Sequence, residues 1–219
     1  ELQGLNPDEE NEIAEGEGGT LYSPVEDMMS DHPTRDEAWA VLTEFTDNPS
    51  LIKHALGVEA AMRAYARSYG EDEEMWATIG LIHDFDYQQN PTEETHLHVG
   101  TKILRERGWP EEWVQIIASH ADYMGVPRDS RAAKTLFAVD ELSGFLTACA
   151  LVRPDKAIAE VKVKSVKKKL KDKAFARGVN RDDVRNGAEE LGVDLGEHIE
   201  FVRNAMATIS DQLELPPSE

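Results

Sequence analysis

The sequence lacks the features of secreted and membrane proteins. Cys149 is the only cysteine, so no internal disulfide can form. No apolar run approaches the roughly 20 residues of a membrane-spanning helix, and no basic segment followed by an apolar one opens the sequence. These absences predict a cytoplasmic protein of a reducing compartment, with no membrane partner.

Positive charge is also scarce. The 219 residues hold 23 Lys and Arg against 43 Asp and Glu, for a net charge of −20. Such a balance argues against a nucleic-acid partner. Residues 1–33 contain no Lys or Arg at all. We predict that they form an acidic, disordered leader, with a partner-binding tail as the alternative.

Alternating apolar and polar residues, the pattern of β-strands, are almost absent, so we predict an all-α fold. Capping residues, glycines and prolines divide the chain into segments with helical periodicity. We expect a helical domain over residues 34–152 and a helical extension packed on it over 153–219. The predicted helices cover residues 34–47, 50–68, 72–83, 92–108, 110–120, 128–152, 162–175, 181–191 and 195–213.

An apolar helical run over residues 77–82 ends in adjacent His83 and Asp84. Neither side chain can be buried cheaply without a partner. Helical spacing places further polar groups on apolar faces, because side chains at i, i+3, i+4 and i+7 share a face. The full inward-facing set is His54, His83, Asp84, His96, His120 and Asp140.

Two neighbouring histidines are separated by the same test. In a helix over residues 92–108, His96 shares a face with Ile103, whereas His98 shares one with Lys102 and Arg105. We therefore expect His96 to face inward and His98 to lie at the surface.

A single histidine on an apolar face is more often a core residue bonded to a carbonyl than a metal ligand. Four such histidines on four helices, together with Asp84 and Asp140, are difficult to satisfy one by one in a single core. A shared metal centre satisfies them together. Imidazole and carboxylate ligands favour a divalent transition metal ion (Mn, Fe, Co, Ni or Zn) over Ca²⁺.

These residues carry a resemblance to a known family. His54, His83-Asp84 and Asp140 resemble the H…HD…D signature of the HD-domain superfamily of metal-dependent phosphohydrolases. His96, in His-Leu-His-Val-Gly, and His120, in Ser-His-Ala-Asp, resemble the extra histidines of its two-metal members. The resemblance covers residues 35–150, and similarity to a branch of small, stand-alone HD proteins extends through 163–176.

The resemblance implies an HD-domain-like helical bundle with additional C-terminal helices. It implies a first ion held by His54, His83, Asp84 and Asp140. Asp84 would bridge to a second ion held by His96 and His120, and Asp84, His96 and His120 would be the catalytic residues. The sequence departs from many relatives in Phe85-Asp86-Tyr87 and in Ala121. It also lacks the Gly-Tyr-Pro tripeptide of cyclic-di-GMP-degrading members, which argues against that activity.

A lysine cluster interrupts the acidic chain. Seven lysines fall within residues 162–173, on a predicted amphipathic helix. A solvated charged face is the simpler interpretation. Beside a metal site, however, lysines also attract phosphate. We predict that Lys164, Lys168 and Lys171, which share one face, contact the substrate; contact with RNA or a membrane is the competing use.

Four further residues lie close to the predicted ligands in sequence: Asp86, Tyr87, Asp122 and Glu141. We expect each to face solvent, with a role as a ligand-orienting partner or proton donor as the alternative. His32 and His198 lack supporting neighbours, and we assign them no role.

The leading functional prediction is hydrolysis of a small phosphomonoester or phosphodiester, with a nucleotide as one candidate, through metal-activated water. One alternative is a di-iron oxygenase, which O₂ consumption would distinguish. Another is a non-catalytic metal-containing sensor, which would bind its ligand without turnover. A homo-oligomer is compatible with the sequence.

Overall fold

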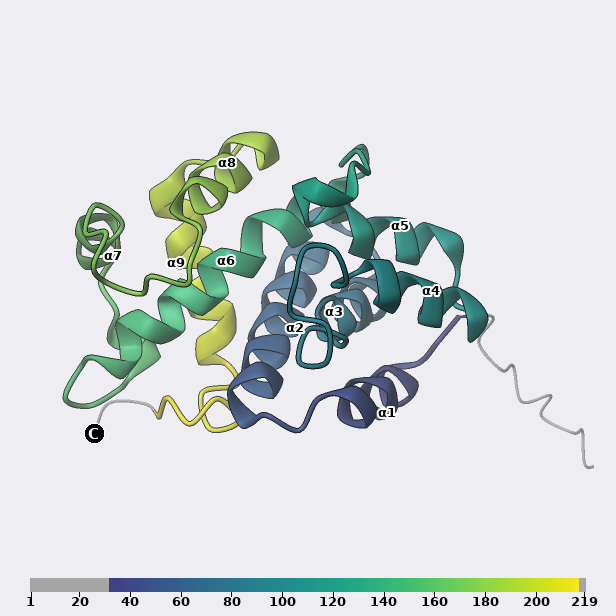
Figure 1. The fold of residues 1–219 in the computed structure, drawn as a ribbon. Coiled ribbons are helices and arrows are strands. Elements are labelled where there is room, and N and C mark those ends of the chain that lie inside the picture. Colours follow the sequence, from purple (N-terminus) through teal and green to yellow (C-terminus); the bar gives the residue numbers. More distant parts are fainter. Residues whose placement is uncertain (1–31, 217–219) are drawn as a thin grey trace, which may run out of the picture.

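The computed structural model describes residues 32–216, and within this range the chain forms helices and turns but no strands (Figure 1). The predicted all-α class is confirmed. Nearly all of the predicted acidic leader, residues 1–31, lies outside the described residues. The α-helices are α1 (Arg35–Phe45), α2 (Pro49–Tyr69), α3 (Glu73–Ile82), α4 (His98–Glu106), α5 (Glu111–Ser119), α6 (Arg131–Leu151), α7 (Val163–Lys169), α8 (Arg181–Leu191) and α9 (Leu195–Ala207).

Local capping chemistry sets the helix ends that the sequence predicted best. Thr34 and Glu37 form a reciprocal capping box at the start of α1. The Asp72 carboxylate accepts from the first backbone N–H groups of α3, at 3.0 Å each. Gly70 ends α2 in the left-handed conformation, at φ 70°, where a residue without Cβ is unstrained.

The core is built around α2, α3 and α6. α2 packs against both α3 and α6, α1 covers α3, and α5 lies on α6. In Figure 1, α2 and α3 occupy the middle of the molecule, with α4 and α5 towards one end and α7 at the other. The largest fully buried side chains include Phe85, Phe145 and Met62. Their burial, at about 1.5–3 kcal/mol each, holds these helices together.

The C-terminal helices share this core. Gly187 brings α8 so close to α6 that a Cβ at this position would lie 2.6 Å from the Ala138 Cα. On α9, the buried His198 ring bonds to the Tyr65 hydroxyl at 2.6 Å and to the Ala138 carbonyl at 2.8 Å. α8 and α9 therefore pack against the helices that carry the candidate site.

The predicted lysine-rich helix over 162–175 is wrong at its C-terminal end. α7 ends at Lys169, and turns follow. The Asp172 carboxylate accepts from the Ala174 N–H at 2.9 Å, a local bond that competes with helical pairing. The Arg181 guanidinium donates to the Asp172 and Phe175 carbonyls, which fixes this turn.

Two other predicted helices are also too long. α9 ends at Ala207, where the Thr208 hydroxyl donates to the Ala205 carbonyl at 2.7 Å. The helix predicted from residue 92 begins only at His98, and Leu97 precedes it with φ 63°. The N–H groups of Leu97 and Gly100 are instead bound by the Asp86 carboxylate, at 3.1 and 3.0 Å.

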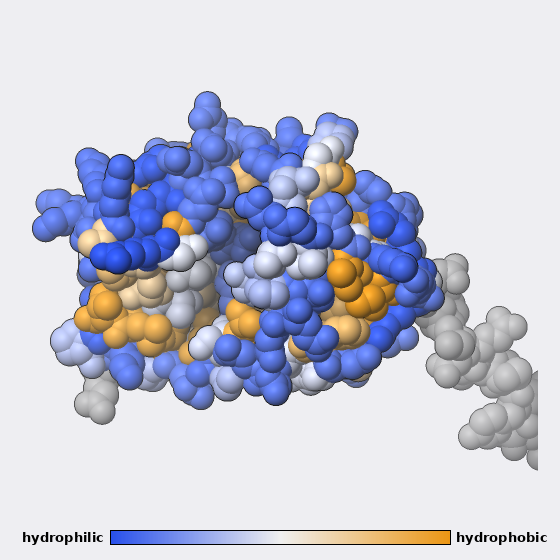
Figure 2. Space-filling view, in the orientation of Figure 1, coloured by the Kyte–Doolittle hydropathy of each residue, from blue (hydrophilic) through white to orange (hydrophobic). Residues whose placement is uncertain are grey.

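The face of the molecule seen in Figure 2 is mainly hydrophilic, with apolar areas on either side of a central recess. Within the described residues, no helix combines the length and apolar character required to cross a membrane.

Candidate metal centre

Five different elements bring the predicted ligands together. α2 carries His54, and the end of α3 carries His83 followed by Asp84. The turn before α4, the end of α5 and the middle of α6 supply the others, which are His96, His120 and Asp140.

The first group consists of His54, His83, Asp84 and Asp140, whose potential ligand atoms all lie within 4.8 Å of one another. His54 Nε2 is 2.9 Å from Asp140 Oδ1, and His83 Nε2 is 3.3 Å from the same oxygen. Two imidazoles and two carboxylates at this spacing suit a divalent transition metal ion.

The second group consists of Asp84, His96 and His120, again within 4.8 Å of one another. His96 Nε2 and His120 Nε2 each lie 3.1 Å from Asp84 Oδ1. Asp84 is thus common to both groups, the arrangement expected of a carboxylate that bridges two ions.

Backbone hydrogen bonds aim two of the imidazoles at this centre. His83 Nδ1 donates to the Gly80 carbonyl at 2.8 Å, and His120 Nδ1 donates to the Ile117 carbonyl at 2.6 Å. Each bond leaves Nε2 directed towards the carboxylates. His83 Nε2 is fully buried and has no hydrogen-bond partner. Such an atom is costly unless something binds it, and a metal ion fits this requirement.

Asp86 orients the third imidazole. It is fully buried, and its Oδ1 lies 3.0 Å from His96 Nδ1. Its Oδ2 accepts from the Leu97 and Gly100 N–H groups. The expectation that Asp86 faces solvent is therefore wrong. Residues in turns have no periodic face, so the helical test gave no sign of this position.

Gly100 reveals how tightly Asp86 is enclosed. A Cβ at position 100 would lie 2.6 Å from the Asp86 Cγ. A glycine four residues after His96 was the one sequence feature that pointed to a buried neighbour here, since close backbone approach often requires glycine.

The pKa values of these residues reflect their mutual attraction. Burial disfavours the charged form of Asp84, but the His83 charge and hydrogen bonds from His120 and His96 outweigh it and hold the pKa of Asp84 well below its usual range. Burial likewise opposes charging His96, yet its bonds to Asp84 and Asp86 raise its pKa to about 9. A metal ion that binds His96 Nε2 would therefore displace a proton from the ring.

A family comparison agrees with the geometry. Residues 51–144 match the family model described as HD domain. This match is consistent with an HD-domain superfamily protein. The match runs from the first turns of α2 into α6 and includes all six residues of the centre. No curated protein and no solved structure matches the chain. HD domains are typical of metal-dependent phosphohydrolases, and the His and Asp cluster is consistent with a divalent metal ion.

An open cavity of about 520 Å³ gives access to the candidate metal centre. Four of the six central residues line it, and α8, outside the matched range, adds Asp183 together with its capping residue Asn180. The other lining residues are Tyr87, Pro91, Thr92, Glu93, Ala121, Asp122, Tyr123, Phe137 and Glu141.

The predicted phosphate-binding lysines do not reach this cavity. Among the described residues, its lining includes no Lys or Arg, and so none of Lys164, Lys168 and Lys171. α7 packs on α9 and α6, away from α4 and α5 (Figure 1). Their use in substrate binding stays a prediction without support from the cavity geometry.

His98 is exposed, as expected, whereas only 6% of the His96 surface is accessible. The prediction about which ring faces inward is correct, but its reason is wrong. His96 lies in a turn, so no helical face aims it, and the positive φ of Leu97 separates the directions of the two rings.

The other residues considered in the sequence analysis differ in their exposure to solvent. Tyr87 and Asp122 are exposed as expected, although both border the cavity, and Glu141 is partly buried beside Asp140. Burial and the Asp140 charge raise the pKa of Glu141 to about 7. His198, to which the sequence gave no role, is a buried structural residue between α9, α2 and α6.

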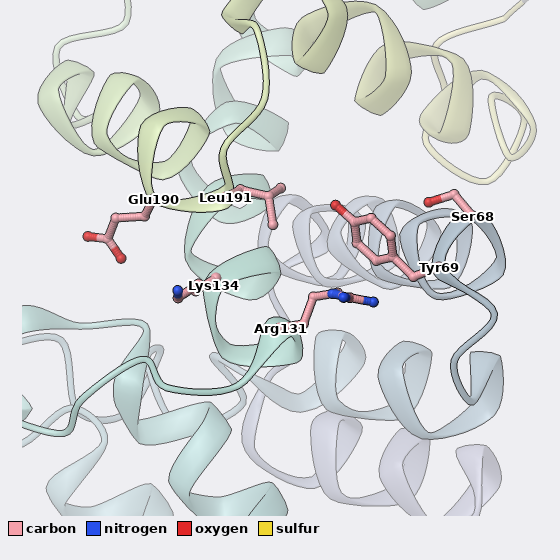
Figure 3. Close-up of a pocket in the computed structure, with 6 residues that line it drawn as sticks. All are labelled: Ser68, Tyr69, Arg131, Lys134, Glu190 and Leu191. Atoms are coloured by element: carbon pink, nitrogen blue, oxygen red, sulfur yellow. The ribbon is translucent and has the colours of Figure 1, made fainter.

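A second cavity, of about 560 Å³, lies where the ends of α2 and α8 meet the start of α6 (Figure 3). Its lining residues are Ser68, Tyr69, Arg131, Lys134, Glu190 and Leu191. It contains none of the six residues of the centre, and Arg131 is already stacked 4.8 Å from the Tyr69 ring centroid. We therefore place the candidate chemistry in the cavity at Asp84.

Proposed function

We propose that this protein is a metal-dependent phosphohydrolase that cleaves a phosphomonoester or phosphodiester in the cavity at Asp84. The observation that carries the proposal is the pair of ligand groups that share Asp84 and enclose the unpartnered Nε2 of His83.

The residues divide into two sets of metal ligands. His54, His83, Asp84 and Asp140 would hold one ion, and Asp84, His96 and His120 a second. A bound divalent ion supplies Lewis-acid polarisation of the phosphoryl group and lowers the pKa of a water molecule.

The rest of the chemistry belongs to the chain. Asp86 fixes the His96 ring so that Nε2 faces Asp84, and the carbonyls of Gly80 and Ile117 do the same for His83 and His120. These bonds preorganise the site before substrate arrives. In the reaction a water oxygen bonds to phosphorus, the ester P–O bond breaks, and the leaving alcohol takes a proton.

Metal analysis of the protein purified without added metal tests the proposal most directly. It is combined with a screen of Mn²⁺, Fe²⁺, Co²⁺, Ni²⁺ and Zn²⁺ against p-nitrophenyl phosphate, bis(p-nitrophenyl) phosphate and nucleotides. We expect bound transition metal and release of phosphate or nitrophenol with at least one ion. Protein that binds no metal and cleaves no ester with any ion would refute the proposal.

Two other outcomes would favour a different function. Consumption of O₂ by the iron-loaded protein, without ester cleavage, would support a di-iron oxygenase. Tight binding of a phosphate ester with no turnover under any metal would support a sensor.

A further inference from the structure

The wall of the cavity around the candidate metal centre is acidic and aromatic. Glu93, Glu141 and Asp183 line it together with the rings of Tyr87 and Tyr123. Because no Lys or Arg of the described chain lines it, this wall offers no cation to a second phosphate or a carboxylate.

Asp183 is the acid that α8 adds to this wall. It is half-buried, and burial together with the Asp122 charge raises the pKa of its carboxyl. Within residues 32–216, no Lys or Arg forms an ion pair with Asp183, Glu93 or Glu141. Negative charge thus accumulates there without a partner from the chain.

The guanidinium of Arg128 already binds other acidic side chains. Arg128 pairs with Asp122 and with Glu190 at 2.8 Å each, and it stacks 3.8 Å from the Phe137 ring centroid. The Arg128 charge also acts on Asp183, but Arg128 is shared between Asp122 and Glu190 and forms no ion pair with Asp183.

Two tyrosines accompany the acids. Tyr87 and Tyr123 are 40% and 38% exposed, and their ring centroids lie 5.1 and 6.4 Å from that of His96. Aromatic rings beside carboxylates suit an ammonium group, which the ring quadrupole and the negative charge both attract.

The same cavity also opens onto the candidate metal centre. The buried, unpartnered His83 Nε2 lies 3.5 Å from Asp84 Oδ2 and 3.3 Å from Asp140 Oδ1. Both carboxylates line the same cavity, so a phosphate at the metal centre would leave the rest of the ester against the acidic wall.

We propose that the substrate is a small phosphate ester whose alcohol part carries an ammonium group, and that Asp183, with Glu93 and Glu141, binds this group. The inference rests on the proposed function, which places the phosphate at the metal centre. A nucleoside triphosphate fits poorly, because its additional phosphates would meet carboxylates with no compensating cation.

A matched pair of esters tests this inference. 2-Aminoethyl phosphate and propyl phosphate have similar size and the same phosphate, but only the first carries an ammonium group. Their dissociation constants are measured calorimetrically on the full chain with Mn²⁺ added, and ester cleavage is followed in parallel. We expect the ammonium ester to bind about tenfold more tightly and ATP to bind more weakly than 2-aminoethyl phosphate.

Asp183→Asn provides the decisive variant, and Asp182→Asn is its control. Asp182 is the adjacent residue on α8, its side chain is 85% exposed, and it does not line the cavity. Asp183→Asn should reduce the preference for the ammonium ester over propyl phosphate severalfold. Asp182→Asn should leave both affinities as in the parent protein.

Equal affinities for the two esters, or a preference that survives Asp183→Asn, would overturn the inference. If propyl phosphate is cleaved but no preference exists, the hydrolase proposal stands and the acidic wall has no such role. If the preference exists and depends on Asp183 but neither ester is cleaved, the ammonium site stands and hydrolysis is refuted.

Discussion

Asp86 shows how one buried carboxylate can organise a site that it does not enter. Its two oxygens bind one imidazole N–H and two backbone N–H groups, and these bonds hold the turn that presents His96. A fully buried carboxylate is tolerable only with such partners. The ring and the turn therefore depend on Asp86 as much as Asp86 depends on them.

Asp86→Asn should disturb both. An amide side chain has a single acceptor oxygen, so it cannot accept from all three donors, and a donor left unsatisfied costs about 1–3 kcal/mol. We expect a lower thermal unfolding midpoint and weaker metal binding, measured by calorimetry and metal analysis. Asp122→Asn is the control, because Asp122 is exposed and its loss should change metal binding little. Unchanged metal affinity in Asp86→Asn would contradict an orienting role.

The shared carboxylate gives a second residue-scale prediction. Asp84→Ala removes a ligand from both groups at once, so we expect loss of bound metal and of ester cleavage. His98→Ala, two residues from His96 but exposed, should keep most of both. Metal content and turnover of the two purified variants provide the measurement. Equal losses in the two variants would show that His98 is as important to the centre as Asp84, which contradicts its exposed position.

At the scale of elements, α8 connects the C-terminal region to the site. Asp183 lines the cavity four residues before Gly187, where α8 approaches α6 closely. Any change that separates α8 from α6 at Gly187 also moves the acidic wall of the cavity.

Gly187→Ala tests this packing. Its Cβ would lie 2.6 Å from the Ala138 Cα, on a backbone that cannot move aside by itself. We expect destabilisation of about 1–3 kcal/mol, which exceeds the gain of up to about 1 kcal/mol from replacing a helical glycine. Gly178→Ala is the control, because nothing lies within 4 Å of its added Cβ. Denaturant unfolding measures both, and equal stability of the two variants would show that α8 does not pack tightly here.

At the scale of the whole molecule, a proton and a metal ion are expected to compete for the His96 ring. In the metal-free protein, hydrogen bonds to Asp84 and Asp86 raise the pKa of His96 to about 9, above its usual 6.5. A raised pKa means that the charged ring stabilises the fold. That contribution is complete below about pH 6.5 and is lost as the pH rises through about 9.

We expect the unfolding midpoint and the metal affinity to change in opposite directions as the pH rises. With chelator present, the unfolding midpoint should fall between pH 6.5 and 9, and His96→Gln should reduce this fall. Mn²⁺ affinity should rise over the same range, because the ion needs a neutral ring. Calorimetric titration at several pH values measures the second trend. An affinity independent of pH across this window would show that no proton leaves His96 on binding.

Helix class and many helix ends follow from short-range patterns that the sequence displays directly. The capping box at Thr34, the Asp72 cap and Gly70 act within a few residues, so they could be predicted. The same holds for the HD pair, because an imidazole and a carboxylate at the end of an apolar helix demand a partner. The inward direction of His54 and Asp140 follows from helical period in the same way.

Other features depend on residues that meet only in the folded chain. The turn before α4 replaces a predicted helical segment because Asp86 binds its N–H groups, and Asp172 and Arg181 stabilise the turns that follow α7. The acidic wall joins α8 to a cavity built mainly by residues 51–144. Periodicity reports which side of a helix is apolar, but it carries no information about which distant side chain will supply the partner. The sequence alone thus determined most of the helices and the residues of a candidate metal centre, whereas only tertiary packing decided what orients these residues and what charge lines the cavity beside them.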